Sequence, residues 1–485
     1  FTFRVANEWT ISDEADGQIA EVEAILHERI KPGLAMILEA QRALQVYPRF
    51  AKKDAAKLEN LHDTVLKDIK LGLHRCRGIL SSSLLYPKQI AKVLHALREL
   101  RLERTQHQLY VDELANLRKG ERHPSQLAKL VISKQPFPKP IKKGTTVTGA
   151  DGEHEEPTLV RLLKAAKTSC TPQSNVRATI LSNDTKKGEE TFSGGEKPLD
   201  SDHYASFFDL KFAKPTRLNI AHLFFEVNLK FHHSDETATT KTVKSGPSEP
   251  FVVITNESQW GDSEGELLRR SVFTDCESVT WEHLANMLQV HFLRSTRQDL
   301  AEPVRPLSLN DLNYLARARF NNRKRVHKDD YDEFWKWFGL ACRRIRHQIP
   351  FHSLWMKGYV FGFISREETE KLLSDQICGV FLVRFSETSA GKVVISYVKH
   401  NSSSKENDVA HLLLAYGPRE APKHLQNILS QKQECTHVLQ LDVNFLQLGP
   451  FTRVPKEHCF KDFRTSSANH VPLASQYEMD QSILP

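Results

Sequence analysis

The sequence predicts a multidomain chain that combines α and β folds, and three observations support this. The chain has 485 residues, whereas a single hydrophobic core stops growing at about 250 to 300 residues. Helical periodicity comes first, and short alternating apolar runs separated by turns follow it. A mixed order of helices and strands closes the chain. We therefore expect an antiparallel helix bundle, a β-sandwich, a second helical domain and an α+β module, in that order.

The first domain, residues 1–122, is predicted to be a helical coiled-coil bundle. Its apolar residues recur at helical spacing between charged ones, including Ile19, Val22, Leu26 and Ile30. Breakers at Pro32–Gly33, at Tyr47–Pro48 and in the 81–87 stretch are expected to cut it into antiparallel helices. The apolar faces form either the core or, less simply, an outer groove for a partner.

A stretch at the start of this domain imitates a calcium-binding loop. In "SDEADGQIAEVE", Gly17 stands at the sixth place and Glu23 at the twelfth. Ser12 replaces the aspartate that such loops carry first, so a helix start is the simpler interpretation. We expect no metal site and no cofactor, because the seven cysteines are scattered without a CxxC pair.

Residues 123–258 are predicted to form the β-sandwich and residues 259–357 the second helical domain. The β-favouring runs are "VRATILS", "SFFDLKF", "HLFFEVNLKF" and "PFVVIT", and the helical runs are "WEHLANMLQVHFL", "LNDLNYLARARF" and "YDEFWKWFGLACRRI". The basic stretch "RFNNRKRVHK" between the last two is either a nuclear-import or DNA-backbone patch or a charged loop.

Residues 358–464 are predicted to form the α+β module. Ser365 and Glu368 make a capping box for a first helix, "GVFLVRFS", "KVVISYV" and "AHLLLAY" are strands, and "KHLQNILSQ" is a second helix. The polar tail 465–485 has little periodicity and is expected to order only on binding.

Arg384 stands in the middle of an apolar strand of this module. Alternation places it on one face with Leu382 and Ser386, inside a sheet. An unpaired guanidinium there would cost several kcal/mol, so Arg384 needs an anionic partner. That partner is either an internal Asp or Glu or an oxyanion of a ligand. Donors on Ser386, Thr388 and Arg366 suit a phosphate.

The stretches "GFISREETEKLL" and "GVFLVRFSET" resemble the Src-homology-two (SH2) domain of signal transducers and activators of transcription, the STAT family. The resemblance implies a phosphotyrosine pocket in which Arg384 binds the phosphate bidentately. It also implies that Arg366, Ser386 and Thr388 assist and that Glu387 shapes the loop. Arg366 replaces the usual lysine and Thr388 the usual serine, and both keep the required donors.

The resemblance extends over nearly the whole chain. "NVRATILS" and "FVVITNESQW" are similar to the family's immunoglobulin-like DNA-binding domain, "VISKQPF" to the start of that domain, and "TWEHLANMLQVHFL" to its helical linker domain. The helical block corresponds to the family's four-helix bundle. Since the chain begins with Phe1, we interpret it as a core fragment lacking the amino-terminal region of such a protein.

Tyr477 in the tail is predicted to be the phosphorylation site, because it is accessible to a kinase and family members place their activating tyrosine there. Phosphorylated Tyr477 of one chain entering the Arg384 pocket of another would make a reciprocal homodimer. Such a dimer could grip a pseudo-palindromic double-stranded DNA site.

Asn256 and Gln259 match the family's groove-contacting loop, although a surface turn is the alternative. Further candidate DNA contacts, each equally well a solvated lysine, are Lys139, Lys142, Lys143, Lys164 and Lys167. The formal net charge of +7 suits an anionic partner without identifying one.

These patterns favour a sequence-specific transcription factor that is activated by a tyrosine kinase and moves from the cytoplasm to the nucleus. The alternative is a phosphotyrosine-binding adaptor, docked on phosphorylated receptors, that never touches DNA. No catalytic motif suggests an enzyme. No apolar run reaches the roughly 18 to 20 residues of a membrane span, so we expect no membrane insertion.

Overall fold

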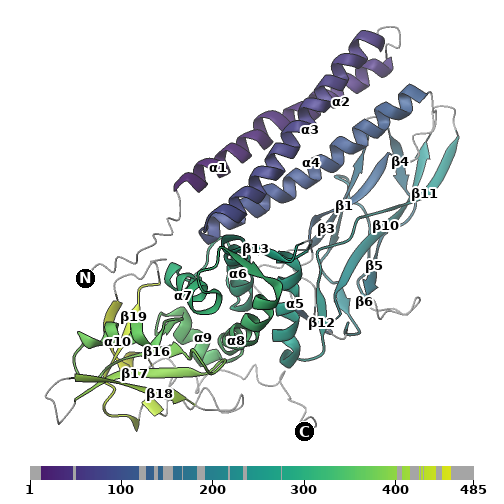
Figure 1. The fold of residues 1–485 in the computed structure, drawn as a ribbon. Helices are drawn as coiled ribbons and strands as arrows, with labels where there is room; N and C mark the ends of the chain where they lie inside the picture. The colour runs from purple at the N-terminus through teal and green to yellow at the C-terminus, as the bar shows by residue number, and fades with distance from the viewer. Residues whose placement is uncertain are drawn as a thin grey trace. The chain divides into compact units, whose positions relative to one another are not determined.

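The computed structural model describes residues 13–46, 51–119, 127–135, 140–145, 157–165, 168–182, 192–216, 219–232, 237–274, 276–400, 407–414, 425, 428–429, 431–443 and 451–459 (Figure 1). The chain packs into two compact units. The first contains residues up to 302 together with 324–331, and the second contains residues 303–323 and those from 332 onward.

Long helices begin the first unit and confirm the predicted bundle. They are α1 (Asp13–Ala24), the π-helical turn η1 (Ile25–Ile30), α2 (Lys31–Val46), α3 (Ala51–Ser82) and α4 (Pro87–Lys119). The continuous helix formed by α1, η1 and α2 runs antiparallel to α3, which runs antiparallel to α4 (Figure 1). The aliphatic residues that recur at helical spacing are buried together, among them Ile30, Ile69 and Leu100. The apolar faces are therefore core, the first of the two alternatives.

The predicted break at Pro32–Gly33 is wrong, because helical structure runs on from Asp13 to Val46. The π-helical turn η1 directly precedes Pro32, so the hydrogen-bonding register widens where proline lacks an N–H donor. Gly33 has a packing role. A Cβ atom there would lie 2.5 Å from Cγ2 of Val65 on α3. Glycine thus allows α2 to approach α3 closely.

Replacing Gly33 by alanine is expected to destabilise the bundle by about 1–3 kcal/mol, because buried, β-branched Val65 has little freedom to move aside. Gly78→Ala on α3 is the matched control, since no atom lies within 4 Å of a Cβ at that position. It should stabilise the helix by roughly 0.5–1 kcal/mol. Urea unfolding followed by helical circular dichroism measures both. Equal stabilisation by the two substitutions would contradict the close approach at Gly33.

The imitation of a calcium loop proves to be helix. Residues from Asp13 onward form α1, and Ala15 and Ile19 are buried in the bundle core. Ser12 lies outside the described residues. Because a calcium loop wraps its side chains around one ion, a regular helix over most of this stretch excludes that geometry. The helix start was the correct alternative.

Short strands follow and confirm the predicted β domain. They are β1 (Ala128–Lys134), β2 (Pro140–Lys142), β3 (Thr158–Lys164), β4 (Ser169–Pro172), β5 (Val176–Ser182), β6 (Phe192–Ser193), β7 (Glu196–Lys197), β8 (Tyr204–Phe207), β9 (Lys211–Phe212), β10 (Ala221–His232), β11 (Ala238–Lys244) and β12 (Val252–Ile254). One sheet has the order β1-β3-β8, and another has the order β11-β10-β5-β7 with β4 also pairing with β10. Inward residues of both sheets share one core, in which alternate residues of β10 are buried.

One strand pair departs from the predicted antiparallel arrangement. β2 and β12 pair in parallel, with Ile254 opposite Lys142. A parallel pair cannot be joined by a tight turn, and here most of the β domain lies between the two strands in sequence. Sequence alternation reports which residues are buried but not which distant strands pair, so this pair could not be predicted.

The first unit ends in helices that continue directly from β12. They are the 3₁₀ turn η3 (Glu257–Gln259), α5 (Trp260–Val272) and α6 (Trp281–Ser295), with β13 (Ser278–Thr280) pairing with β14 (Arg325–His327). Buried Asn286 of α6 fastens this part to the turn between α3 and α4. Its Oδ1 accepts from the N–H of Leu85 at 3.0 Å, and its Nδ2 donates to the carbonyls of Leu80 and Ser83.

The second unit combines helices with a mixed sheet. Its elements are α7 (Leu309–Phe320), α8 (Lys328–His347) from Asp332 onward, α9 (Ile349–Met356), β15 (Val360–Gly362), α10 (Arg366–Ser374), β16 (Val380–Phe385), β17 (Val393–His400), β18 (Asn407–Leu414), β19 (His437–Leu441) and β20 (Phe451–Pro455). The sheet order is β18-β17-β16-β19-β20, and β15 also pairs with β16. The capping box of Ser365 and Glu368 at the start of α10 is confirmed.

The predicted second helix of this module, "KHLQNILSQ", falls mostly outside the described residues. The strands β15, β19 and β20 were not predicted. They are short, and β20 ends in proline, which the rules for strands exclude from interior positions. The stretch "RFNNRKRVHK" ends α7, turns through Asn321 and Asn322 at positive φ, and then forms β14.

Buried Asp311 of α7 joins the helices of the second unit to its sheet. Its carboxylate accepts from the N–H and the hydroxyl of Ser308, at 2.9 and 2.7 Å, and from the N–H of Phe363 at 2.9 Å. Arg305 is the counter-charge, and its guanidinium lies 4.2 Å from the ring centroid of Trp355 on α9. Gly362 makes room for this group, because a Cβ there would lie 2.6 Å from Asp311 Oδ1.

Candidate functional site: the anion pocket of the second unit and the edge of the β domain

Arg384 lies on β16, in the interior of the sheet, as alternation predicts. β16 is flanked by β17 on one side and by β15 and β19 on the other. Every residue of β16 is buried, and the side chain of Arg384 is 4% exposed. Because a guanidinium cannot lose its proton in a protein, a positive charge is held inside the module.

The internal partners of this charge are weak. Glu387 Oε2 lies 3.8 Å from Arg384 Nη1, beyond hydrogen-bond distance, and Nη1 donates to the carbonyl of Phe385 at 3.3 Å. Arg384 Nε is buried without any hydrogen-bond partner in the described part of the chain. Burial lowers the pKa of Arg384 from its ordinary value, and Glu387 opposes this. An internal carboxylate, that of Glu387, is thus near Arg384, as the first alternative requires. It does not satisfy the hydrogen-bonding capacity of the guanidinium.

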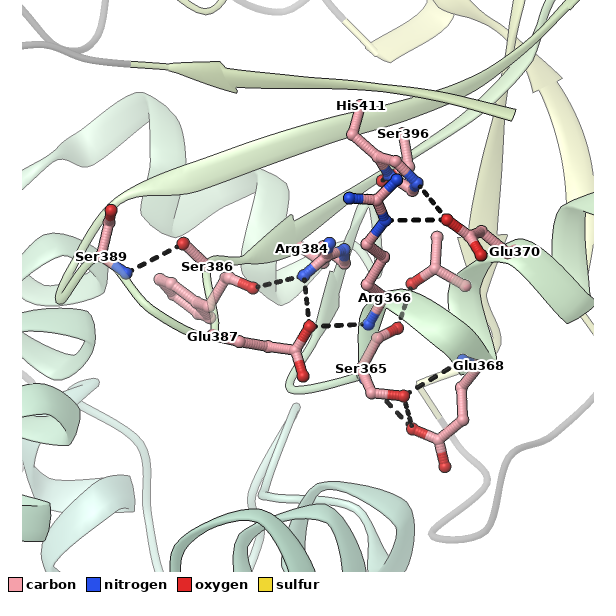
Figure 2. Close-up of polar contacts among 12 residues, drawn as sticks. Ser365, Arg366, Glu368, Glu370, Arg384, Ser386, Glu387, Ser389, Ser396 and His411 are labelled. Atoms are coloured by element: carbon pink, nitrogen blue, oxygen red, sulfur yellow. Dashed lines mark hydrogen bonds and ion pairs between the residues drawn. The ribbon is translucent and has the colours of Figure 1, made fainter. Parts of the chain in front are cut away.

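Arg366 approaches Arg384 from the start of α10 (Figure 2). Its side chain is 66% exposed, and its Nε donates to Glu370 Oε1 at 2.8 Å. The backbone N–H of Arg366 donates to Glu387 Oε2 at 2.8 Å, which ties the helix start to the loop after β16. Arg366 and Arg384 each lower the pKa of His411, after the larger effect of burial. The two arginines therefore form one positive site.

The loop after β16 carries the other predicted pocket residues. Ser386 is buried, and its Oγ accepts from the N–H of Ser389 at 3.1 Å, which leaves the hydroxyl proton available for donation. Glu387 is partly exposed and Thr388 is exposed. The structure thus brings together Arg366, Arg384, Ser386 and Glu387, and places Thr388 on the same loop.

Two helices outside the predicted module hold this loop, and sequence reasoning missed them. Arg319 Nη2 of α7 donates to the carbonyl of Glu387 at 2.6 Å, and Trp337 Nε1 of α8 donates to the carbonyl of Ser386 at 3.0 Å. The Arg319 guanidinium also lies 3.7 Å from the ring centroid of Trp337. Burial and then Glu387 raise the pKa of neighbouring Tyr314 to about 12, so its phenol stays neutral. We refer to Arg319 and Trp337 as the loop clamp.

Replacing Trp337 by phenylalanine is expected to weaken binding of a phosphotyrosine peptide about fivefold to tenfold. The ring remains, but the N–H that fixes the Ser386 carbonyl is lost, and a hydrogen bond of this kind is worth about 1 kcal/mol. Fluorescence anisotropy with a labelled peptide measures the affinity. Trp335→Phe, the same change on the same helix, should leave it within twofold. Equal affinities of both variants would show that the clamp does not order the loop.

The predicted DNA-contacting loop lies where the parallel pair β2–β12 ends. Asn256 is exposed and caps η3 through its Oδ1, which accepts from the N–H of Ser258 at 3.1 Å. Gln259 Oε1 accepts from the N–H of Thr255 at 2.9 Å. No hydrogen bond from either amide nitrogen is found among the described residues. The loop is thus a surface turn whose amide nitrogens are available as donors.

Two of the five predicted lysines lie beside this loop. Lys142 stands opposite Ile254, and the N–H of Lys143 donates to the carbonyl of Ile254 at 2.9 Å. Lys164 lies elsewhere, at the end of β3 opposite Ala128, where its carbonyl accepts from Gln106 of α4. β3 belongs to the sheet β1-β3-β8, whereas β2 pairs with β12 in a separate sheet. Lys139, Lys167 and Tyr477 fall outside the described residues.

Comparisons with known proteins agree with this arrangement. Family models match as a STATa immunoglobulin-like domain over residues 128–254, an EF-hand fold domain over 256–348 and an SH2 domain over 359–440. Among named proteins, the chain is 32% identical to signal transducer and activator of transcription A of Dictyostelium discoideum over 396 residues, 80% of this chain and 54% of that protein. It is 31% identical to transducer B of the same organism over 446 residues, 85% of this chain and 37% of that protein.

Further similarity is shorter. The chain is 40% identical to human signal transducer and activator of transcription 4 over 73 residues, 15% of this chain and 9% of that protein. It spans about half, or less, of the lengths of the two Dictyostelium relatives.

The central-strand arginine and the SH2 match define a signalling protein with an SH2 domain. The immunoglobulin-like domain and the long alignments narrow this class further. The chain belongs to the family of signal transducers and activators of transcription.

Two further observations concern the described residues only. None of their His, Cys, Asp and Glu side chains gather in groups of three or more that could hold a metal ion. None of their helices is both long enough and apolar enough to cross a membrane.

Proposed function

We propose that this chain is the core of a sequence-specific transcription factor that dimerises when Tyr477 is phosphorylated. The observation that carries the proposal is the buried Arg384, whose Nε has no hydrogen-bond partner and whose Nη1 has no carboxylate nearer than 3.8 Å in the part of the chain that the structure describes. A phosphate offers acceptors for a bidentate contact with such a fork, and Arg366 and the Ser386 hydroxyl lie beside it as further donors.

The ligand of this pocket is the phosphotyrosine made at Tyr477 by a tyrosine kinase. Phosphorylation adds nearly two negative charges and three acceptor oxygens. Exchange of the two tails between two chains closes a reciprocal homodimer, and the second contact forms at high effective concentration. The phosphorylated dimer moves from the cytoplasm to the nucleus.

The DNA-facing surface is the edge where β2 and β12 end. Asn256 and Gln259 present amide donors there, and at the same end Lys142 is the last residue of β2 and Lys143 follows it. Amide side chains read base edges and lysines neutralise phosphates. Lys139 and Lys167 remain proposed contacts. Lys164 remains a proposed contact as well, from the end of β3 in a different sheet.

Sedimentation of the chain before and after phosphorylation by a tyrosine kinase tests the switch. A monomer that becomes a dimer on phosphorylation, and stays monomeric in a Tyr477→Phe variant, supports it. Phosphorylated chain that remains monomeric at micromolar concentration contradicts it. Adding double-stranded oligonucleotides then separates the alternatives. Sequence-selective, salt-sensitive binding is expected of the transcription factor, whereas an adaptor would bind phosphorylated receptor peptides and no DNA.

Replacing Asn256 by serine is expected to reduce discrimination among DNA sequences by about 1–3 kcal/mol at the contacted base pair. Serine can still cap η3, so the change removes mainly the amide donor. Competition binding of the phosphorylated dimer to a matched and a mismatched oligonucleotide measures the effect. The dimer mass should stay unchanged. An unaltered sequence preference would remove this loop from the DNA surface.

A further inference from the structure

A chain of hydrogen bonds behind Arg366 links three elements of the second unit (Figure 2). Arg366 Nε donates to Glu370 Oε1 at 2.8 Å, and His411 Nε2 of β18 lies 3.0 Å from the same oxygen. Ser396 Oγ of β17 lies 2.8 Å from His411 Nδ1. Because an ionised carboxylate only accepts, Nε2 carries the proton, and Nδ1 of the neutral ring accepts from the Ser396 hydroxyl.

This chain of hydrogen bonds engages only Nε of the Arg366 side chain. Its Nε is taken by Glu370, whereas neither Nη nitrogen has a hydrogen-bond partner among the described residues. Figure 2 shows Glu370 on the side of the Arg366 guanidinium away from Arg384. Hydrogen bonds from Arg366 and then His411 lower the pKa of Glu370, so its carboxylate is ionised at neutral pH.

Arg366 needs such support more than Arg384 does. The Arg366 side chain is 66% exposed, whereas that of Arg384 is 4% exposed and packed within a strand. A free arginine side chain samples many rotamers, and part of this entropy is lost when its fork is fixed on a ligand. A partner that fixes Nε beforehand reduces that loss and keeps the planar fork available.

We propose that Glu370 is a positioning residue of the phosphate site, which holds the guanidinium of Arg366 through Nε so that both Nη nitrogens face an incoming phosphate. Ser396 and His411 hold Glu370 in turn. The inference rests on the proposed binding of phosphotyrosine. By charge alone, the Glu370 carboxylate would be expected to weaken phosphate binding, whereas here it has a supporting role.

Two neutral variants separate positioning from charge. Glu370→Gln and Glu370→Ala both remove the negative charge, but only glutamine keeps an Oε1 that can accept from Arg366 Nε. We expect the alanine variant to bind a phosphotyrosine peptide of residues 471–485 at least fivefold more weakly than the glutamine variant. Glu367→Gln and Glu367→Ala, whose parent carboxylate pairs with Lys371 on the same helix, should differ by less than twofold.

A double-mutant cycle locates the effect. In an Arg366→Ala background, alanine and glutamine at position 370 should bind the peptide equally, because the group being positioned is absent. The measurement is anisotropy of labelled peptide on the unphosphorylated whole chain. Thermal unfolding of each variant monitors the fold.

The outcomes are distinct. If the wild type binds the peptide, Arg384→Ala does not, and the two Glu370 variants bind alike, then Glu370 does not position Arg366 and the proposed function stands. If the difference persists without Arg366, Glu370 acts on another group and the inference is wrong. If the wild type itself does not bind the peptide, the proposed function fails and this inference fails with it.

Discussion

Arg384→Ala is expected to lower affinity for the phosphorylated peptide by about thirtyfold or more. Truncating one partner of a buried, hydrogen-bonded charge pair typically costs 2–5 kcal/mol, and each 1.4 kcal/mol is about tenfold in affinity. Arg384 is the buried arginine of the site, so the exposed side chain of Arg366 cannot replace its fork. Dimers of the phosphorylated chain should disappear in the same variant.

The fold should tolerate this change. Among the described residues Arg384 Nε has no hydrogen-bond partner and the Glu387 carboxylate is 3.8 Å from Nη1, so the substitution relieves a buried charge as well as losing packing. Arg453→Ala, which removes an exposed arginine from β20 of the same sheet, is the matched control. Arg384→Lys keeps the charge without the planar fork, and its affinity for the peptide should lie between those of Arg384→Ala and Arg453→Ala. Peptide binding by Arg384→Ala within threefold of the wild type would refute the pocket assignment.

Asp311→Ala is expected to destabilise the second unit by about 3–5 kcal/mol, the usual cost of leaving a buried charge uncompensated. The change leaves Arg305 buried without its counter-charge and leaves the N–H of Phe363 without an acceptor. Burial lowers the pKa of Arg305 to about 10, so this guanidinium still carries its charge at neutral pH.

Asp311→Asn provides the comparison. The amide oxygen can still accept from the N–H of Phe363. This variant therefore loses the charge but keeps the hydrogen bond, and it should be less destabilised than the alanine variant. Glu367→Ala removes an exposed, helix-surface carboxylate and should change stability by less than about 1 kcal/mol. Guanidinium unfolding followed by tryptophan fluorescence, with Trp337 and Trp355 in this unit, reports the transition. A stability change below 1 kcal/mol for Asp311→Ala would show that the carboxylate does not hold α7 against β15.

The sequence predicted those parts of the pocket that depend on local pattern. Arg384 interrupts an apolar strand, and the capping box fixes Arg366 at a helix start, so neighbouring residues are enough to place both. The immunoglobulin-like strands were predicted for the same reason, since alternation along "HLFFEVNLKF" reports burial directly.

The rest depends on contacts between residues far apart in sequence. Trp337 stands 49 positions from Ser386, and Arg319 stands 68 positions from Glu387. In the sequence of α8, Trp337 cannot be distinguished from the neighbouring aromatic residues of the core. His411 lies on a half-buried strand, and nothing nearby indicates its contact with Glu370. The Pro32–Gly33 interpretation failed because composition does not show that a neighbouring helix approaches there.

The loop clamp has a consequence for the evolution of this protein. A recognition domain can be transferred between proteins when all the contacts that hold its binding site lie within the domain. In this chain, helices upstream of the module hold the loop after β16. A fragment of residues 358–464 alone would lack the hydrogen bonds from Arg319 and Trp337 to that loop. Transfer of the module alone to another protein would therefore leave this loop without two of its hydrogen bonds.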